Sequence, residues 1–375
     1  MLLLSLHLAC APPQAAGPLP QDAYVWQQVW TPAVQEAAYA HSFRELVVLG
    51  GTLDWEEGLV LFERPALPRG SALALRVEAP PAGEDTLPAL QNALAQLALA
   101  HPEAPYLQLD MDLPTRRLGE YARWMEALSQ AGLPPLRITA LPTWLDDPAF
   151  EDLAQAAPHY VLQLHWLDPA DPTHLLDPQA LSHIEQAGEV GQPFAVALPS
   201  YSYSLHFDAN GEQAGLSAEQ GQAPPRGGHS ETLRADPAAV AEVVAALELA
   251  HPQELEALIW FRLPTAQDQN SWSLATLTSV AAGVAPVTRA ELQVRATGDQ
   301  LWQFSLHNIG TETLLLPELS WDSDPALWDA LGSYHRNQGH LSPGAAQTLP
   351  PGASQIVAWA RGPVEPGLSV VSNAP

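Results

Sequence analysis

The chain repeats one pattern eight times between residues 22 and 285, a short apolar run followed in most cases by a segment with helical periodicity. The runs lie at 24–29, 45–53, 72–78, 106–112, 136–141, 160–166, 194–198 and 257–261. Strands that alternate with helices pair in parallel, and the continuously apolar run at 194–198 indicates that both faces of the sheet are covered. Eight units of this size predict an α/β fold, a (β/α)8 TIM-like barrel.

An open, doubly wound sheet is the competing fold. That fold carries a glycine-rich turn after its first strand when it binds a dinucleotide, whereas Trp30-Thr31-Pro32 stands at this position. The sequence therefore favours the closed barrel.

Two stretches depart from the repeat. Residues 202–234 are polar and glycine-rich, with a hairpin signal at 208–211, and we expect a lid or rim beside the barrel. From about Pro286 the helical pattern ends, and alternating runs at 291–295, 301–306 and 354–360 predict a small C-terminal β-sandwich. We expect a signal-like segment with a linker at 1–21, the barrel at 22–285 and the β-sandwich-like domain at 286–375.

The one cysteine, Cys10, follows the apolar run 2–9 and precedes a stretch rich in proline, alanine and glycine. That order resembles a lipoprotein signal, in which the cysteine is lipidated. We therefore expect an exported protein anchored in the membrane through Cys10, with a cytoplasmic protein as the alternative. No other apolar stretch reaches about 18 residues, the length that spans a bilayer.

The charge balance narrows the classes of partner. Acidic residues number 42 against 15 basic ones, the net charge is -27, and every basic residue is arginine. Such a chain repels phosphate backbones and anionic lipids, so we expect no nucleic-acid partner and no membrane contact beyond the lipid anchor. The lack of lysine excludes Schiff-base chemistry on this chain.

Carboxylates gather where strands two to four of the predicted barrel end. Asp110 and Asp112 end the run 106–112 and point to the same face, because strand side chains alternate. Glu78 and Asp54 end the two preceding runs. Since barrel enzymes place their chemistry at the carboxyl ends of the strands, we expect these four residues to be catalytic. A helix-capping role is the structural alternative for Asp54.

Aromatic and polar residues recur at the ends of the same predicted strands. Sugar rings stack their apolar faces on tryptophan and tyrosine, so the expected substrate-binding residues are Trp26, Trp55, Trp144, His165, Trp166, Tyr201, Tyr203, Trp260 and Arg262. Each has a structural alternative: aromatic side chains cap cores, His165 fits a core histidine, and Arg262 fits an ion pair with Asp112 or Glu78.

Four strings resemble a bacterial family of unknown function. They are 107–112 with Arg116, Arg117, Leu118 and Tyr121, then 162–166, 197–201 and 259–262. More remotely, 107–114 is similar to the Asp-x-Asp-x-Glu strand of chitinase-type glycoside hydrolases, whose Glu is the proton donor. With Asp110 and Asp112 in the two Asp positions, Pro114 takes the place of the donor. With a shift of two residues, the trio is Gln108, Asp110 and Asp112, and Asp112 is the donor.

These features predict a glycoside hydrolase-like protein that acts on a poly- or oligosaccharide. Asp112 would be the general acid, its pKa raised by Asp110. Glu78, Asp54 or the substrate's own N-acetyl group would serve as base or nucleophile. We expect no metal and no cofactor. The alternatives are a non-catalytic carbohydrate-binding lipoprotein, which Pro114 favours, and an envelope-assembly protein that uses its β-rich tail as a contact surface.

Overall fold

The computed structural model describes residues 17–371, except 41, 65, 66, 79, 82, 84, 167–173, 218–224, 266, 267, 269, 270, 324, 345 and 346. The proposed lipidation site, Cys10, lies outside these residues. No helix in the described part of the chain is both long and apolar enough to cross a membrane.

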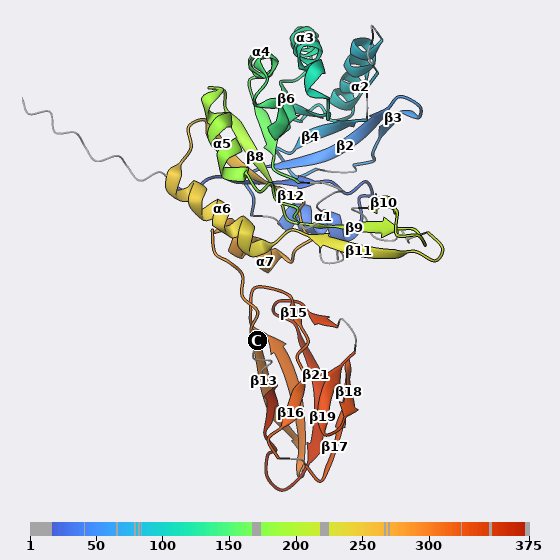
Figure 1. Cartoon of the computed structure of the whole chain (residues 1–375), viewed down its shortest axis with the longest axis vertical. Helices are drawn as coiled ribbons and strands as arrows, with labels where there is room; N and C mark the ends of the chain where they lie inside the picture. Colours follow the sequence, from blue (N-terminus) through green and yellow to red (C-terminus); the bar gives the residue numbers. More distant parts are fainter. Residues whose placement is uncertain are drawn as a thin grey trace, which may run out of the picture.

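Within the described residues, eight parallel strands close into a barrel (Figure 1). Pairing of the first strand with both the second and the last closes the ring. In spatial order the strands are β1 (Gln21–Val25), β2 (Leu46–Asp54), β4 (Ala72–Val77), β5 (Leu107–Asp110), β6 (Leu136–Ala140), β7 (Tyr160–Gln163), β8 (Phe194–Pro199) and β12 (Leu255–Phe261). The barrel predicted from the sequence is therefore present.

Helices follow seven of these strands in the described chain. They are α1 (Pro32–Ala40), α2 (Thr86–Ala100), α3 (Leu118–Ser129), α4 (Pro148–Ala156), α5 (Ala180–Glu189), α6 (Pro237–Ala250) and α7 (Leu274–Ala281), with short 3-10 turns at Thr115–Arg117 and Pro142–Trp144. The second unit departs from the expected repeat, because β2 turns back into the antiparallel strand β3 (Gly58–Leu61). Asp54 closes this turn by accepting bonds from the backbone N–H groups of Glu56 and Glu57.

Apolar side chains fill two layers of the barrel. One core lies between the strands and the helices, and a smaller one inside the ring includes Tyr24, Val47, Ala74, Val161 and Ile259. Close packing of α2 on β2 depends on a glycine: a Cβ atom on Gly50 would lie 2.6 Å from Cδ1 of Leu97. Because both faces of the strands are buried in apolar surroundings, each polar group inside the barrel needs a hydrogen-bond or ion-pair partner.

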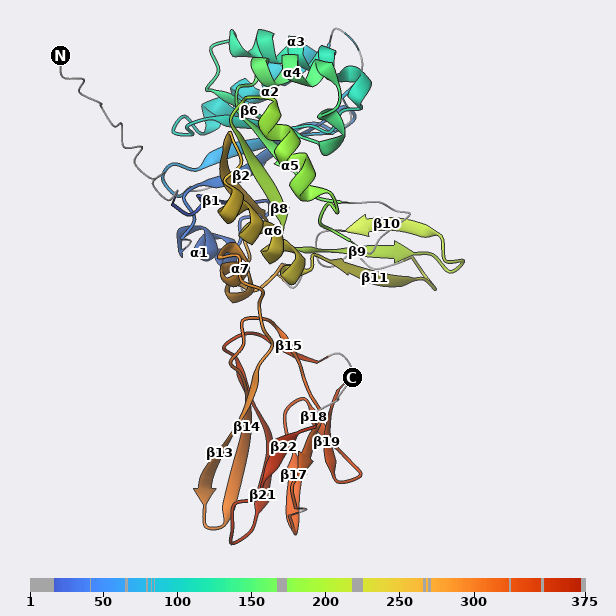
Figure 2. The ribbon, with the colours of Figure 1, turned by 60° about the vertical axis from the view of Figure 1, so that its left-hand side comes forward.

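The insertion after β8 forms a three-stranded antiparallel sheet, where the sequence predicted a lid or rim. Its strands are β9 (Ser202–Phe207), β10 (Gln213–Ser217) and β11 (His229–Arg234), in the order β10-β9-β11. Asp208 forms the predicted hairpin turn by accepting bonds from the N–H groups of Asn210 and Glu212. Figures 1 and 2 show this sheet projecting from the side of the barrel.

The C-terminal part is built of antiparallel strands, and it fits a β-sandwich only loosely. Its described strands form the sheets β13-β14-β21-β17 and β18-β19-β16-β22 and the pair β15-β20. Their bounds are β13 (Ala290–Gly298), β14 (Leu301–Asn308), β15 (Leu314–Leu315), β16 (Leu319–Trp321), β17 (Leu327–Ala330), β18 (Tyr334–Asn337), β19 (His340–Pro343), β20 (Thr348–Leu349), β21 (Ser354–Arg361) and β22 (Leu368–Val370). Phe304, Trp321 and Trp328 lie in a core separate from that of the barrel.

Candidate functional site

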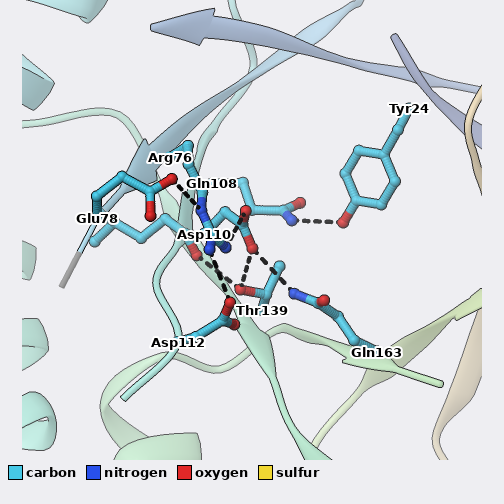
Figure 3. Close-up of polar contacts among 9 residues, drawn as sticks. Tyr24, Arg76, Glu78, Gln108, Asp110, Asp112, Thr139 and Gln163 are labelled. Atoms are coloured by element: carbon cyan, nitrogen blue, oxygen red, sulfur yellow. Dashed lines mark hydrogen bonds and ion pairs between the residues drawn. The ribbon is translucent and has the colours of Figure 1, made fainter. Parts of the chain in front are cut away.

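Strand β5, the fourth strand of the barrel, and the segment that follows it carry a row of polar side chains on the inner face. Gln108, Asp110 and Asp112 are spaced two residues apart, and Figure 3 shows the side chains of Asp110 and Asp112 joined through Arg76. Exposure rises along the row: Gln108 is fully buried, the Asp110 side chain is 6% exposed and that of Asp112 is 42% exposed. The predicted aspartate pair therefore shares one face, and its outer member reaches solvent.

Side chains from three other barrel strands, β4, β6 and β7, hold Asp110. Its Oδ1 accepts bonds from Thr139 Oγ1 at 2.8 Å and from Gln163 Nε2 at 3.0 Å. Its Oδ2 accepts from Arg76 Nη1 at 2.9 Å. A carboxylate bound on both oxygens in this way has a fixed orientation, so Asp110 is a rigid part of the site.

Arg76 on β4 joins the carboxylates into one cluster. Besides Asp110, its guanidinium contacts Asp112 Oδ2 at 2.9 Å and Glu78 Oε1 at 3.1 Å. Burial disfavours the charged guanidinium, but the three carboxylates outweigh that effect and raise the pKa of Arg76. Arg76 is charged, and three carboxylates face one cation.

The pKa of Asp112 is raised. Desolvation is the larger cause and the charge of Asp110 the next, whereas Arg76 acts in the opposite direction. A raised pKa keeps a carboxyl group protonated to higher pH, as a general acid requires. The direction agrees with the sequence-based expectation for Asp112.

Below the carboxylates, Gln108 Nε2 donates to the Tyr24 hydroxyl at 2.6 Å. Its Oε1 is buried and has no hydrogen-bond partner among the described residues. Gln108 also lines a cavity of about 20 Å³ at the base of the barrel, enough for about one water molecule.

Aromatic rings form a continuous group near the same mouth. The Phe261 ring contacts those of Tyr24, Trp26, His165 and Tyr201, and Tyr201 in turn contacts Tyr203. Burial raises the pKa of the Tyr203 hydroxyl, the charge of Asp112 acts in the same direction, and the charge of Arg76 opposes it. The structure thus brings together Trp26, His165, Tyr201 and Tyr203 from the predicted binding set. Glu78, Asp110 and Asp112 come together from the predicted catalytic set.

His165 is a neutral member of this group. Burial lowers its pKa to about 3. Its Nε2 is buried without a hydrogen-bond partner in the described part of the chain. An uncharged imidazole can donate from one nitrogen and accept at the other.

Four predicted site residues have other places in the structure. Trp260 is fully buried in the layer under the helices, packs against Trp272 and donates to Gln21 Oε1 at 2.7 Å. Trp144 is buried too and donates to the Leu113 carbonyl at 3.0 Å. Trp55 packs against the same outer core. The Asp54 carboxylate stabilises the β2–β3 turn by accepting two backbone hydrogen bonds.

Two further predicted residues remain near the mouth without joining the carboxylates. The buried Arg262 forms its ion pair with Asp268 at 2.6 Å, so the structural alternative of a pair with Asp112 or Glu78 is wrong. Trp166 is half-buried, and its backbone N–H donates to the Leu175 carbonyl.

The central residue that the sequence did not single out is Arg76, together with its neighbours Thr139 and Gln163. One signal was available, because Arg76 lies two residues before Glu78 and so shares its face of the strand.

No set of three or more His, Cys, Asp and Glu side chains in the described ranges is arranged to hold a metal ion. A cavity of about 700 Å³ lies elsewhere, between 174–182 and the start of α6, and no member of the carboxylate cluster lines it.

Two solved structures show remote likeness to this chain. A GH18 chitinase from Pseudoalteromonas aurantia aligns over 71% of this chain and 100% of its own, with a TM-score of 0.43 and 12% identity. A putative alpha-galactosidase/melibiase from Bacteroides fragilis NCTC 9343 aligns over 92% of this chain and 79% of its own, with a TM-score of 0.36 and 10% identity. No curated protein matches the chain.

A protein-family model matches residues 88–266 of this chain. That range covers β5, β12 and the strands between them, so it includes Asp110 and Asp112 but not Arg76. The resemblance noted in the sequence to a family of unknown function is confirmed: residues 88–266 match the model of the family described as Domain of unknown function (DUF3142).

Proposed function

We propose that this barrel is a glycoside hydrolase-like protein that acts on a poly- or oligosaccharide, with Asp112 as its general acid. The observation that carries the proposal is the row Gln108, Asp110 and Asp112, which runs along the inner face of β5 and continues just beyond its last residue. Its outer member is an exposed carboxyl group with a raised pKa at the mouth of the barrel. This corresponds to the alignment in which Asp112 takes the donor position of the chitinase-type strand motif.

In this mechanism Asp112 protonates the glycosidic oxygen while the bond from that oxygen to the anomeric carbon breaks. Water then adds to the anomeric carbon and gives its proton either to the Asp112 carboxylate, which restores the acid directly, or to Glu78, which releases it to solvent while Asp112 takes up a proton from solvent. Glu78, whose side chain is 50% exposed beside the same Arg76, is the protein group in place to stabilise the cationic sugar or to accept the proton from water. The substrate's own N-acetyl oxygen is the alternative for the first of these tasks.

The neighbouring rings supply a surface for a sugar. Trp26 and Tyr203 are half-buried, so each has a hydrophobic face supported by the core and a part left open. Carbohydrates stack their C–H faces on such rings and hydrogen-bond to polar groups around them. Asp112 and Glu78 would be those polar groups.

Turnover of a panel of fluorogenic glycosides tests the proposal. The wild type should hydrolyse at least one of them, and Asp112→Asn should lower the rate by about 100-fold or more, the usual contribution of a general acid. Asp152→Asn, an exposed aspartate on α4, is the matched control and should keep full activity. Oligosaccharide binding measured by calorimetry should survive the Asp112 substitution.

A second candidate is a carbohydrate-binding protein without turnover. The ion pair between Arg76 and Asp112 favours it, because a cation at 2.9 Å stabilises the ionised form that cannot donate a proton. Oligosaccharide binding with no turnover in the wild type would select this function. Neither binding nor turnover would reject both.

We also propose that the chain is exported and lipidated at Cys10. The support is the sequence pattern alone, an apolar run closed by the single cysteine. Incorporation of labelled palmitate into the wild type but not into Cys10→Ser would support the proposal, and equal labelling of the two would reject it.

A further inference from the structure

One side chain outside the β5 row touches every carboxylate of the cluster. Arg76 points from β4 to Glu78, Asp110 and Asp112, and it bonds each through a different nitrogen, Nε, Nη1 and Nη2 (Figure 3). The strand register places Arg76 directly beside Asp110. A planar guanidinium presents its donors as a fork, so it can bind several carboxylates at fixed angles.

The two oxygens of Asp112 are not equivalent. Arg76 Nη2 binds Oδ2 at 2.9 Å, while no contact to Oδ1 is found among the described residues. When Asp112 is protonated, Oδ2 can still accept from Arg76, and the proton then resides on Oδ1. Asp112 lies beyond the last residue of β5, so the ladder does not fix its side chain.

Building on the proposed function, we propose that Arg76 is the positioning residue of the site: it fixes Asp112 through Oδ2, beside Asp110, and leaves Oδ1 as the atom that donates the proton. Without it, Asp110 and Asp112 would repel each other on one face of the barrel. Asp112, which is partly exposed, would be the one to turn away, because Asp110 is also held by Thr139 and Gln163.

The groups that interact electrostatically with Asp112 come from four elements. Arg76 and Glu78 lie at the end of β4, Asp110 on β5, Tyr203 on β9 and Tyr121 on α3. Arg76 is the cation among them, so its removal leaves Asp112 among acidic and phenolic groups. Asp112 would then hold its proton to higher pH, and the falling limb of a rate profile that needs protonated Asp112 would move upward.

Carboxyl NMR of the folded protein tests this inference, with the Asp112 resonance assigned by its loss in Asp112→Asn. In Arg76→Gln the titration midpoint of Asp112 should rise by about one pH unit or more, the usual effect of losing an adjacent opposite charge. Arg123→Gln, an exposed arginine on α3, is the matched control and should leave the midpoint unchanged. With an active wild type, kcat should fall while KM changes little, because the aromatic surface is intact.

Arg76→Lys gives the second readout, which also serves if the Gln variant does not fold. It keeps the charge but presents its donors from a single nitrogen in place of the planar fork, so it cannot hold the three carboxylates in the same arrangement; the midpoint should stay nearer that of the wild type while kcat still falls. A folded Arg76→Gln protein with an unchanged Asp112 midpoint would overturn the inference, as would Arg76→Lys with wild-type kcat. These outcomes differ from failure of the proposed function, which is the absence of turnover in the wild type and leaves the titration measurable.

Discussion

The hydroxyl of Tyr201 lies 3.5 Å from Nδ1 of His165, at the outer limit of a hydrogen bond. On the other side of the imidazole, Nε2 has no partner in the described part of the structure. The rings of Tyr201 and Phe261 pack against it at 5.6 and 5.2 Å. His165 is half-buried among these rings, and desolvation keeps its imidazole neutral.

We expect His165 to remain uncharged throughout the pH range in which a glycosidase would work. Burial lowers its folded-state pKa to about 3, whereas the unfolded chain binds the proton near pH 6.5. The unfolded state thus gains a proton first, and stability is lost progressively as the pH falls from 6.5 toward 3. Imidazole NMR should show no titration of His165 above about pH 4, given this pKa.

The matched variant is His165→Phe, which keeps a ring but removes the proton site. Between pH 6.5 and 4 the wild type should lose more thermal stability than this variant. A His165 midpoint near 6, or equal pH dependence of the two proteins, would contradict the expectation.

Replacement of Asp110 tests the inner part of the cluster. Asp110→Asn places a donor group among three donors, from Thr139, Gln163 and Arg76. We expect the free energy of unfolding to fall by about 2–4 kcal/mol, because a buried, satisfied carboxylate is lost. Asp112→Asn should cost less than about 1 kcal/mol, since that side chain is partly exposed. Urea unfolding measures both, and equal losses would show that burial does not separate the two aspartates.

The sequence predicted the barrel and one row of its site because both depend on local periodicity. Apolar runs separated by helical segments specify the eight strands, and the spacing of Asp110 and Asp112 specifies a shared face. Arg76 was missed because its role depends on the pairing of β4 with β5, which places it beside Asp110. Such a register comes from the tilt of the whole barrel and is not visible in either strand alone.

The sequence also did not determine which residues of the last barrel strand, β12, point into the barrel and which point toward the helices. Trp260 and Phe261 are both aromatic, and a shift of one residue exchanges the two faces. In the structure Phe261 joins the aromatic group of the mouth, and Trp260 packs under the helices. The second unit differs for a local reason, because Asp54 closes a hairpin where the repeat predicted no return strand.

Arg64 provides a test that is independent of catalysis. It is 7% exposed and donates to the backbone carbonyls of Leu49, Gln27 and Gln28, which fixes the loop after β1. Burial lowers its pKa to about 10, so it stays charged at neutral pH. Arg64→Met should reduce the free energy of unfolding by about 2–4 kcal/mol, because several buried carbonyls lose their donor.

Hydrogen exchange locates this effect. Amides of the loop at 27–31 should exchange faster in Arg64→Met than in the wild type, and Arg64→Lys should not restore them, because an ammonium cannot span three carbonyls. Arg69→Met, which replaces an exposed arginine nearby, is the control. Faster exchange spread evenly over the barrel would show general destabilisation in place of a local clamp.

Two substitutions of Gln108 distinguish the contribution of its volume to stability from the contribution of its polar group. It is fully buried, donates to Tyr24 and leaves Oε1 without a partner among the described residues. Gln108→Met removes one unsatisfied acceptor but also leaves the buried Tyr24 hydroxyl without this donor, so the two effects oppose each other and stability should change by less than about 1 kcal/mol. Gln108→Ala leaves a cavity, and we expect it to cost about 2–4 kcal/mol. Chemical denaturation measures both, and a Met variant as unstable as the Ala variant would mean that Oε1 is bound, with the adjacent 20 Å³ cavity holding the water that satisfies it.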